Sequence, residues 1–305
     1  MSILIAIDQG TTSTRTVAFD KDLNIIHSEQ KEYPLIYPND GWVEIAPEEL
    51  MSSVYATIDP VIEACSDISA IGITNQRETT LVWDADSGEP IYNAIVWQDR
   101  RTAEQCMQLK KAGHEEAIKN ATGLLLDPYF SSTKISWILD NVDGARKRAD
   151  AGKLRFGTVD TYLLWQLTHG EIYKTDVTNA SRTNLYNIHL KEWDSELLKI
   201  FNIPRSMLPE VQSSDSNYGT LVRGNKTIQI SGVIGDQQSA LVGQRCFQSG
   251  QMKATFGTGC FLMVNTGDES LLSTSGLLNT LGYGLSGKVS YALEGSIFSA
   301  GTIIQ

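Results

Sequence analysis

The sequence has few of the residues that build disulfide scaffolds or metal-binding motifs. Four cysteines are spread over 305 residues, and no two of them form a CxxC pair. This spacing excludes a disulfide-rich scaffold and gives no sign of a structural zinc site or a redox dithiol. HExxH, GxSxG, EF-hand and GxxxxGK[ST] motifs are also absent. We expect reduced, mostly buried thiols in a cytoplasmic protein.

Long hydrophobic runs and positive charge are scarce as well. No stretch approaches the ~18 apolar residues that cross a membrane, and residues 1–7 lack the basic region of a signal peptide. Lysine plus arginine number 25 against 36 aspartate plus glutamate, which gives a net charge of −11. An acidic surface repels phosphate backbones, so neither nucleic acid nor membrane insertion is expected. A small anionic ligand at a local site is still compatible with this charge.

The patterning of the chain predicts an α/β protein. Hydrophobic residues make up 41% of it, enough for a core, and its length suggests about two domains. Apolar runs and alternation predict strands over 2–7, 15–20, 25–33, 68–74, 80–83, 91–96 and 227–233. Helical spacing predicts helices over 100–111, 132–141, 160–167, 194–201 and 237–244, and one that begins at Pro47.

Three local expectations follow from turn and helix chemistry. Pro60 should kink or end the helix that begins at Pro47, because proline lacks the backbone N–H. Strands 80–83 and 91–96 should pair around the turn at Asp86–Gly88. Asp194 should cap the helix that follows it.

The predicted secondary structure changes near residue 246, from alternating helices and strands to hairpins. Hairpins are predicted over 252–266 and 277–292, and a helix should begin at 297–305. We place a boundary near residue 245, between a domain of residues 1–245 and a unit of residues 246–305. The second unit is small for a domain, and the chain stops inside the predicted helix, so we expect a fragment.

One glycine motif is discounted. Residues 282–287 fit GxGxxG, but residues 288–293 alternate like a strand, whereas a dinucleotide site needs a helix there. A glycine-rich hairpin turn explains the motif better.

The run Asp8-Gln-Gly-Thr-Thr-Ser-Thr-Arg15 is different, because it places hydroxyls and backbone N–H groups at a hairpin tip. Such a concave set of donors suits phosphate. Asp8 would repel phosphate unless a hard cation lay between them, which predicts Mg²⁺ bound through water. Thr255-Phe-Gly-Thr-Gly259 is a second tip of this type. For both runs an ordinary β-turn is the alternative.

Several polar or aromatic residues follow predicted strands, where ligands collect in open α/β sheets. Besides Asp8, they are Arg77, Glu78, Trp97, Asp160 and Asp236. The alternatives are a helix N-cap for Asp236, a surface ion pair for Arg77 and Glu78, and packing for Trp97 and for Tyr129.

Together these residues resemble the FGGY family of carbohydrate kinases, and within it the glycerol kinases. The matching runs are Asp8–Ser13, Gly41–Glu44, Gly72–Thr80, Ala94–Gln98, Asp127–Phe130, Gly157–Asp160, Thr178–Thr183, Gly235–Gln238 and Gly257–Gly259. The run Asn75–Thr79 and the run Trp97–Arg101 are the ones that indicate glycerol kinase rather than xylulose or ribulose kinase.

The resemblance implies a ribonuclease-H-like, actin-like ATPase fold, with a mixed sheet flanked by helices and a truncated second lobe of the same type. It implies ATP-dependent phosphorylation of glycerol to sn-glycerol 3-phosphate, with Mg²⁺, in a homo-oligomer (dimer or tetramer). It implies Asp236 as catalytic base, and it implies a glycerol site formed by Arg77, Glu78, Trp97, Tyr129, Asp236 and Gln237. It implies nucleotide contacts from Thr11, Thr12, Ser13, Arg15, Thr258, Gly301 and Gln305.

The length of the chain and its loop at 222–226 differ from those of the relatives. Relatives are longer, so we expect the 305 residues alone to be inactive. The loop at 222–226 is short and lacks histidine, so control by a sugar bisphosphate or by phosphotransfer is not implied. Two other functions stay open: a kinase for another small polyol or ketose, and a non-catalytic actin-like nucleotide-binding module.

Overall fold

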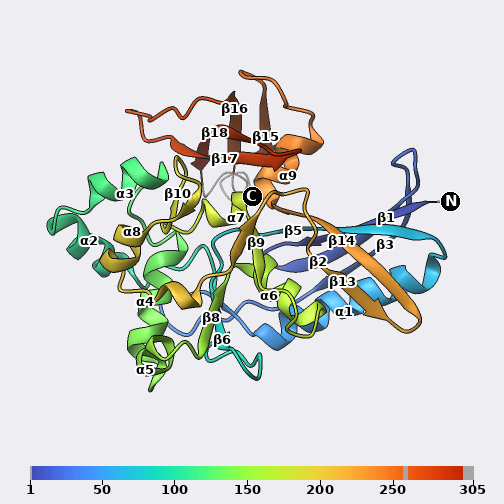
Figure 1. Cartoon of the computed structure of the whole chain (residues 1–305), viewed down its shortest axis with the longest axis horizontal. Coiled ribbons are helices and arrows are strands. Elements are labelled where there is room, and N and C mark those ends of the chain that lie inside the picture. The colour runs from blue at the N-terminus through green and yellow to red at the C-terminus, as the bar shows by residue number, and fades with distance from the viewer. Residues whose placement is uncertain (1, 257–259, 298–305) are drawn as a thin grey trace.

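A six-stranded mixed sheet is the largest sheet among the described residues (Figure 1). The structure, a computed structural model, describes residues 2–256 and 260–297. The strand order is β13-β14-β5-β1-β2-β3, with β1, β5 and β14 parallel and the other pairs antiparallel. The strands are β1 (Ile3–Gln9), β2 (Ser13–Phe19), β3 (Ile25–Glu32), β5 (Ile68–Asn75), β13 (Thr220–Arg223) and β14 (Lys226–Gly235).

Apolar alternation explains why this sheet forms. Ile3, Ile5 and Ile7 of β1 all point into the core, and their neighbours are less buried. Two helices cover this face of the sheet: α1 (Pro47–Ala64) packs against β2 and β3, and α6 (Val159–Leu167) packs against β5. The result is the mixed sheet flanked by helices that the sequence predicts.

A second, four-stranded antiparallel sheet is drawn in orange and red in Figure 1. Its order is β15-β16-β18-β17, and its strands are β15 (Met252–Phe256), β16 (Cys260–Gly267), β17 (Leu278–Leu285) and β18 (Lys288–Ile297). Helix α9 (Asp236–Gly243) contacts β14 and β5 of the large sheet and also β15, β16 and β17. The short helix α7 (Val177–Ala180) likewise contacts β14 and β17. These two helices therefore join the sheets.

The remaining elements form a mainly helical region. A second core cluster, which includes Phe156, Tyr186 and Phe201, lies here and also takes in Leu281 and Tyr291 of the second sheet. The helices of this region are α2 (Ala103–Lys111), α3 (Glu115–Thr122), α4 (Ser131–Asn141), α5 (Ala145–Asp150), α8 (Ser195–Ile200) and the 3-10 turn η1 (Arg205–Met207). Its short strands are β4 (Glu44–Ile45), β6 (Leu81–Asp84), β7 (Ala94–Ile95), β8 (Leu154–Gly157), β9 (Lys174–Asp176), β10 (Tyr186–Asn187), β11 (Glu192–Trp193) and β12 (Glu210–Gln212). Among the helices described, none combines the length and apolar character needed to cross a bilayer.

Two local predictions hold only in part. Helix α1 continues past Pro60 to Ala64, because Val61 and Ile62 beyond the proline are buried and their packing offsets the lost hydrogen bond. The hairpin predicted for 80–96 is reduced to isolated bridges, one joining Thr80 to Ile95. Strand β6 pairs with β8 and β7 pairs with β4, so distant segments replace the local partner.

Other local predictions are confirmed. Asp194 caps α8 by accepting hydrogen bonds from the backbone N–H groups of Glu196 and Leu197. The discounted GxGxxG run lies in the β17–β18 hairpin. Of the helix predicted from residue 297, only Ile297 is described, at the end of β18, and the rest lies outside the described residues.

Asp160, the second residue of α6, is fully buried under the large sheet. Burial raises the pKa of its carboxyl group to about 7, although hydrogen bonds from Thr158 (2.5 Å) and Thr175 (2.6 Å) oppose the shift. The nearby carboxylate of Asp176 raises this pKa further. The folded protein therefore holds a proton on Asp160 far more tightly than the unfolded chain does.

This difference makes folding stability depend on pH. Because the folded pKa lies above the ordinary value of 3.8, the contribution of Asp160 is fully present in acid and is lost as the pH rises through about 7. We expect the wild-type free energy of unfolding, relative to that of Asp160→Asn, to fall by about 2–3 kcal/mol between pH 5 and pH 8. Urea denaturation of both proteins across this range measures the difference. Parallel profiles would contradict the assignment.

Candidate active site

A cavity of about 390 Å³ opens where the three parallel strands of the large sheet end. Its lining includes all six residues predicted to bind glycerol and two of those predicted to bind phosphate. The lining residues are Thr11, Thr12, Leu35, Tyr37, Gln76, Arg77, Glu78, Trp97, Gln98, Tyr129, Asp236, Gln237, Thr255 and Phe261. Asp160, grouped with the strand-end residues above, is not among them.

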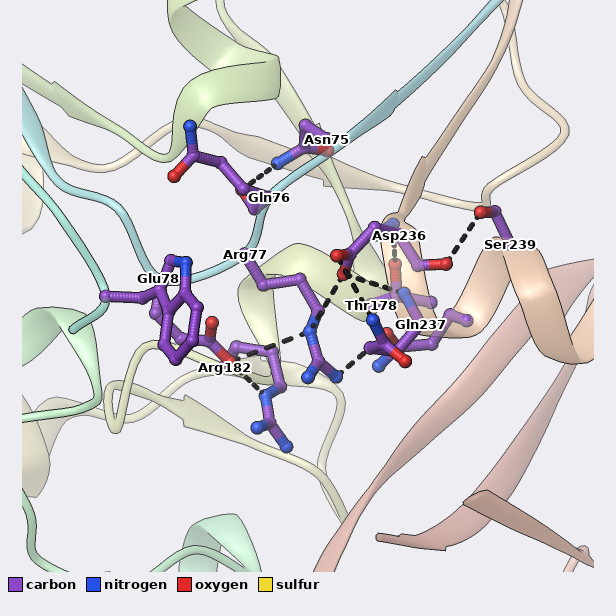
Figure 2. Close-up of polar contacts among 12 residues, drawn as sticks. Asn75, Gln76, Arg77, Glu78, Thr178, Arg182, Asp236, Gln237 and Ser239 are labelled. Carbon is purple, nitrogen blue, oxygen red and sulfur yellow. Dashed lines mark hydrogen bonds and ion pairs between the residues drawn. The ribbon is translucent and has the colours of Figure 1, made fainter. Parts of the chain in front are cut away.

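The register of the parallel strands brings these residues together. Asn75 at the end of β5 pairs with Gln9 of β1 on one side and with Gly235 of β14 on the other. Arg77 follows β5 by two residues, and Asp236 follows β14 directly. Figure 2 shows the Arg77 side chain between Glu78 and Asp236. Strand ends at one sheet edge thus place a cation between two acids.

Arg77 and Glu78 belong to a cluster of four buried charges with Arg182 and Glu294, none more than 2% exposed. Arg77 donates Nη1 to Glu294 Oε2 at 2.6 Å and Nη2 to Glu294 Oε1 at 3.0 Å. Arg182 donates Nε to Glu78 Oε1 at 2.6 Å and Nη2 to Glu294 Oε1 at 2.9 Å. The formal charges of the cluster cancel, and the surface ion pair considered for Arg77 and Glu78 is excluded.

The pKa values of the two acids in this cluster are shifted in opposite directions. Burial raises the pKa of Glu78, against the opposing charges of Arg77 and Arg182. Burial would also raise the pKa of Glu294, but the two arginines outweigh it and lower that pKa to about 2.

Glu78 also has a φ of +62°, a left-handed conformation uncommon outside glycine. Its backbone is held in this conformation beside the cavity.

Asp236 is the first residue of α9, and its side chain is 36% exposed. Its Oδ1 accepts from the backbone N–H of Gln237 at 2.7 Å and lies 3.4 Å from Arg77 Nε. Its Oδ2 accepts from Gln237 Nε2 at 3.2 Å. The N-cap position belongs to Gly235, so Asp236 is not the cap residue considered above. The carboxylate is anchored and still reaches the cavity.

Aromatic rings from three segments form a wall of the cavity. Trp97 meets Tyr129 and Phe261 edge to face, with ring centroids 5.8 Å and 6.2 Å apart. The Trp97 indole Nε1 donates to Thr11 Oγ1 at 2.9 Å, which ties this wall to the first hairpin. Arg77 Nη2 donates to the Tyr129 hydroxyl at 3.3 Å. Trp97 and Tyr129 therefore pack and line the cavity at once.

The β1–β2 hairpin presents only part of its predicted phosphate set to the cavity. Thr11 and Thr12 line it, whereas Ser13 accepts from Gln30 at 3.3 Å and Arg15 donates Nε to Ser28 at 3.1 Å. The predicted ligands Thr258, Gly301 and Gln305 lie outside the described residues.

Asp8 lies on β1, is exposed to solvent and is not among the residues that line the cavity; protein groups nevertheless surround much of its carboxyl group. Desolvation by these groups raises the pKa of its carboxyl group, the charge of Asp236 raises it further, and Arg15 opposes both. Across the described ranges 2–256 and 260–297, no three His, Cys, Asp or Glu residues are arranged to hold a metal ion.

Arg182, Lys253, Phe261 and Glu294 are among the residues at or behind this site that sequence reasoning missed. Arg182 lies within a run that carried the family resemblance, but nothing local marks it as a partner of Glu78. Glu294 leaves a weak signal, because it is a lone acid next to Ala292 and Leu293 in an otherwise apolar stretch of strand. All but Arg182 come from the second sheet.

Comparison with known proteins agrees with this geometry. The model of the FGGY family of carbohydrate kinases, N-terminal domain, matches residues 3–243. A glycerol kinase of Xanthomonas campestris pv. campestris is 53% identical in sequence over 99% of this chain, and the match covers 62% of that protein. A glycerol kinase of Alteromonas mediterranea is 57% identical over 99% of this chain, and the match covers 63% of that protein. The crystal structure of Plasmodium falciparum glycerol kinase with ADP superimposes on 100% of this chain with a TM-score of 0.94 at 40% identity, over 62% of its own length.

The chain therefore belongs to the FGGY family of carbohydrate kinases. The predicted actin-like ATPase fold is confirmed, because its structural neighbours are kinases of this family. The chain spans about 62% of the length of the curated relatives it matches.

The buried charge cluster predicts a large effect of Glu294→Gln on stability. Removing this carboxylate leaves two buried arginines with one acid, so we expect the free energy of unfolding to fall by about 3–5 kcal/mol. Glu196→Gln, at an exposed pair with Lys199, is the matched control and should change it by less than about 1 kcal/mol. Urea denaturation measures both, and equal stabilities of the two variants would contradict the importance of the cluster.

Proposed function

We propose that this chain carries the glycerol site and part of the phosphate site of an ATP-dependent glycerol kinase that produces sn-glycerol 3-phosphate. One observation carries the proposal: Asp236, Arg77 and Glu78 line the same cavity as Thr11 and Thr12. An alcohol-binding set and a phosphate-binding hairpin thus face one space. The glycerol kinases among the relatives support the same activity.

Glycerol is an uncharged molecule with three hydroxyls, so its site must offer paired donors and acceptors. An unpaired buried polar group costs about 1–3 kcal/mol. Arg77 donates, Glu78 and Asp236 accept, and Trp97 with Phe261 covers the carbon chain. A site of this kind favours a small polyol over an apolar alcohol.

Asp236 acts as the general base in this proposal. Its carboxylate accepts the proton of the attacking terminal hydroxyl as that oxygen bonds to the γ-phosphorus of ATP. The bond between the γ-phosphorus and the β,γ-bridging oxygen breaks at the same time, and ADP leaves with that oxygen. Thr11 and Thr12 donate to the phosphates. The family resemblance implies further nucleotide contacts from Thr258, Gly301 and Gln305, and from Ser13 and Arg15 once their side chains leave Gln30 and Ser28. Closure around both substrates excludes water, which would otherwise take the phosphoryl group.

Asp8 would hold Mg²⁺ through water. Burial raises the pKa of Asp8 and the charge of Asp236 raises it further, so a divalent cation beside Asp8 would oppose both effects by favouring the charged carboxylate. Mg²⁺ normally takes one or two carboxylates together with waters and phosphate oxygens. When bound, it neutralises charge on the phosphates.

The state of the cysteines bears on the cellular setting of the enzyme. The four cysteines are unpaired, and three of them are buried, as expected of a cytoplasmic protein. A homo-oligomer, either dimer or tetramer, and a domain boundary near residue 245 stay predictions from the sequence.

The role of Asp236 is tested in a full-length protein that carries these residues. Asp236→Asn should lower kcat for glycerol by about 10²–10⁴, the range expected for loss of a general base. Asp268→Asn, on an exposed turn of the second sheet, should leave kcat unchanged. A coupled assay of ADP release measures both variants, and near wild-type turnover by Asp236→Asn would remove it from this role.

The same assay on the wild-type enzyme separates the alternatives. ADP release with glycerol, but much less with xylulose or ribulose, supports the proposed substrate. Release with a ketose alone would assign another activity of the family, and no release with any acceptor would favour a non-catalytic nucleotide-binding module.

A further inference from the structure

We infer that Lys253, on β15, is a positioning residue that fixes the side-chain amide of Gln237 so that this amide donates to the Asp236 carboxylate. The inference rests on the proposed function, in which Asp236 is the base. It adds a residue of the second sheet to the machinery around the base.

The contacts form a short chain of hydrogen bonds. Lys253 is 4% exposed, and its Nζ donates to Gln237 Oε1 and, at 2.9 Å, to Thr255 Oγ1. Gln237 is 8% exposed, and its Nε2 donates to Asp236 Oδ2 at 3.2 Å. Figure 2 shows Gln237 beside Asp236 at the start of α9. Lys253 thus reaches the base through one intervening side chain.

The chemistry of the three groups allows one orientation of the amide. An ammonium group only donates hydrogen bonds and a carboxylate only accepts them, whereas an amide does both. With Oε1 toward Lys253 and Nε2 toward Asp236, both contacts are hydrogen bonds. A reversed amide would set two donors against each other at Lys253 and two acceptors at Asp236. Lys253 therefore selects the orientation that holds Asp236 Oδ2.

Burying a lysine here is unfavourable, which argues that its charge has a use. Burial lowers the pKa of Lys253 to about 8, the charge of Arg77 lowers it too, and Glu294 and Asp236 oppose the shift. The amine thus keeps most of its charge near neutral pH. A neutral apolar side chain would fill the same space without this desolvation cost.

A double-mutant cycle in the full-length enzyme tests the inference. Lys253→Met should lower kcat for glycerol about 10- to 100-fold while KM for ATP changes less than about twofold. In a Gln237→Ala background, the same substitution should lower kcat further by less than about threefold, because its route to Asp236 is already gone. Lys288→Met, at the exposed start of β18, is the matched control and should match wild type.

Lys253→Arg separates charge from packing. It keeps a side chain that only donates, so kcat should stay within about fivefold of wild type. If Lys253→Met does not fold, Lys253→Gln replaces it: its amide can present either end to Gln237, and at least a tenfold loss of kcat is expected.

Three results would overturn the inference: wild-type kcat in Lys253→Met or Lys253→Gln, equal losses in both backgrounds of the cycle, or a loss in Lys253→Arg as large as in Lys253→Met. Each of these requires an active wild-type enzyme and leaves the proposed function intact. A wild-type enzyme without glycerol-dependent ADP release would instead overturn both proposals.

Discussion

The cluster of Arg77, Glu78, Arg182 and Glu294 is the interaction on which the site depends. Taking four charges out of water costs several kcal/mol each, so the cluster persists only because every charge meets an opposite one at close range. Its members come from segments distant in sequence, with Glu294 on the second sheet. Packing of that sheet against the rest of the protein therefore holds Arg77 at the cavity wall. The site is complete only when the second sheet is in place.

The large sheet supplies the second constraint. Its three parallel strands end at one edge, and backbone register aligns Gln9, Asn75 and Gly235 there. The residues that follow these strand ends are placed by hydrogen bonds of the sheet. Asp236 gains further rigidity from the start of α9, where Gln237 contacts it through both backbone and side chain. The proposed base therefore stands on rigid structure, as catalytic geometry requires.

Much of this arrangement could be predicted from local sequence patterns. Alternation located β1, β5 and β14, and the rule that ligands gather at strand ends selected Arg77, Glu78 and Asp236. The same rule wrongly included Asp160, because a strand-end position does not show whether the side chain points to the cavity or into the core. What local patterns did not predict was non-local: β6 forms its strand ladder with β8 and only isolated bridges with its neighbour, and packing carries α1 past Pro60.

The roles of residues in the second sheet were harder to predict than its strands. Glu294 and Lys253 act through contacts with residues far away in sequence, and no spacing pattern encodes such contacts. The one signal, at Glu294, is a charge within a largely apolar stretch of strand, which is expensive to bury unless a partner exists. This signal can point to a site, but it cannot name the partner.

The central claim is that one cavity binds glycerol between Arg77, Glu78 and Asp236. A crystal structure of the protein with glycerol tests it most directly. The account predicts glycerol hydroxyls within hydrogen-bonding distance of Arg77, Glu78 and Asp236, with the carbon chain against Trp97. Glycerol bound elsewhere, with this cavity left to solvent, would contradict it.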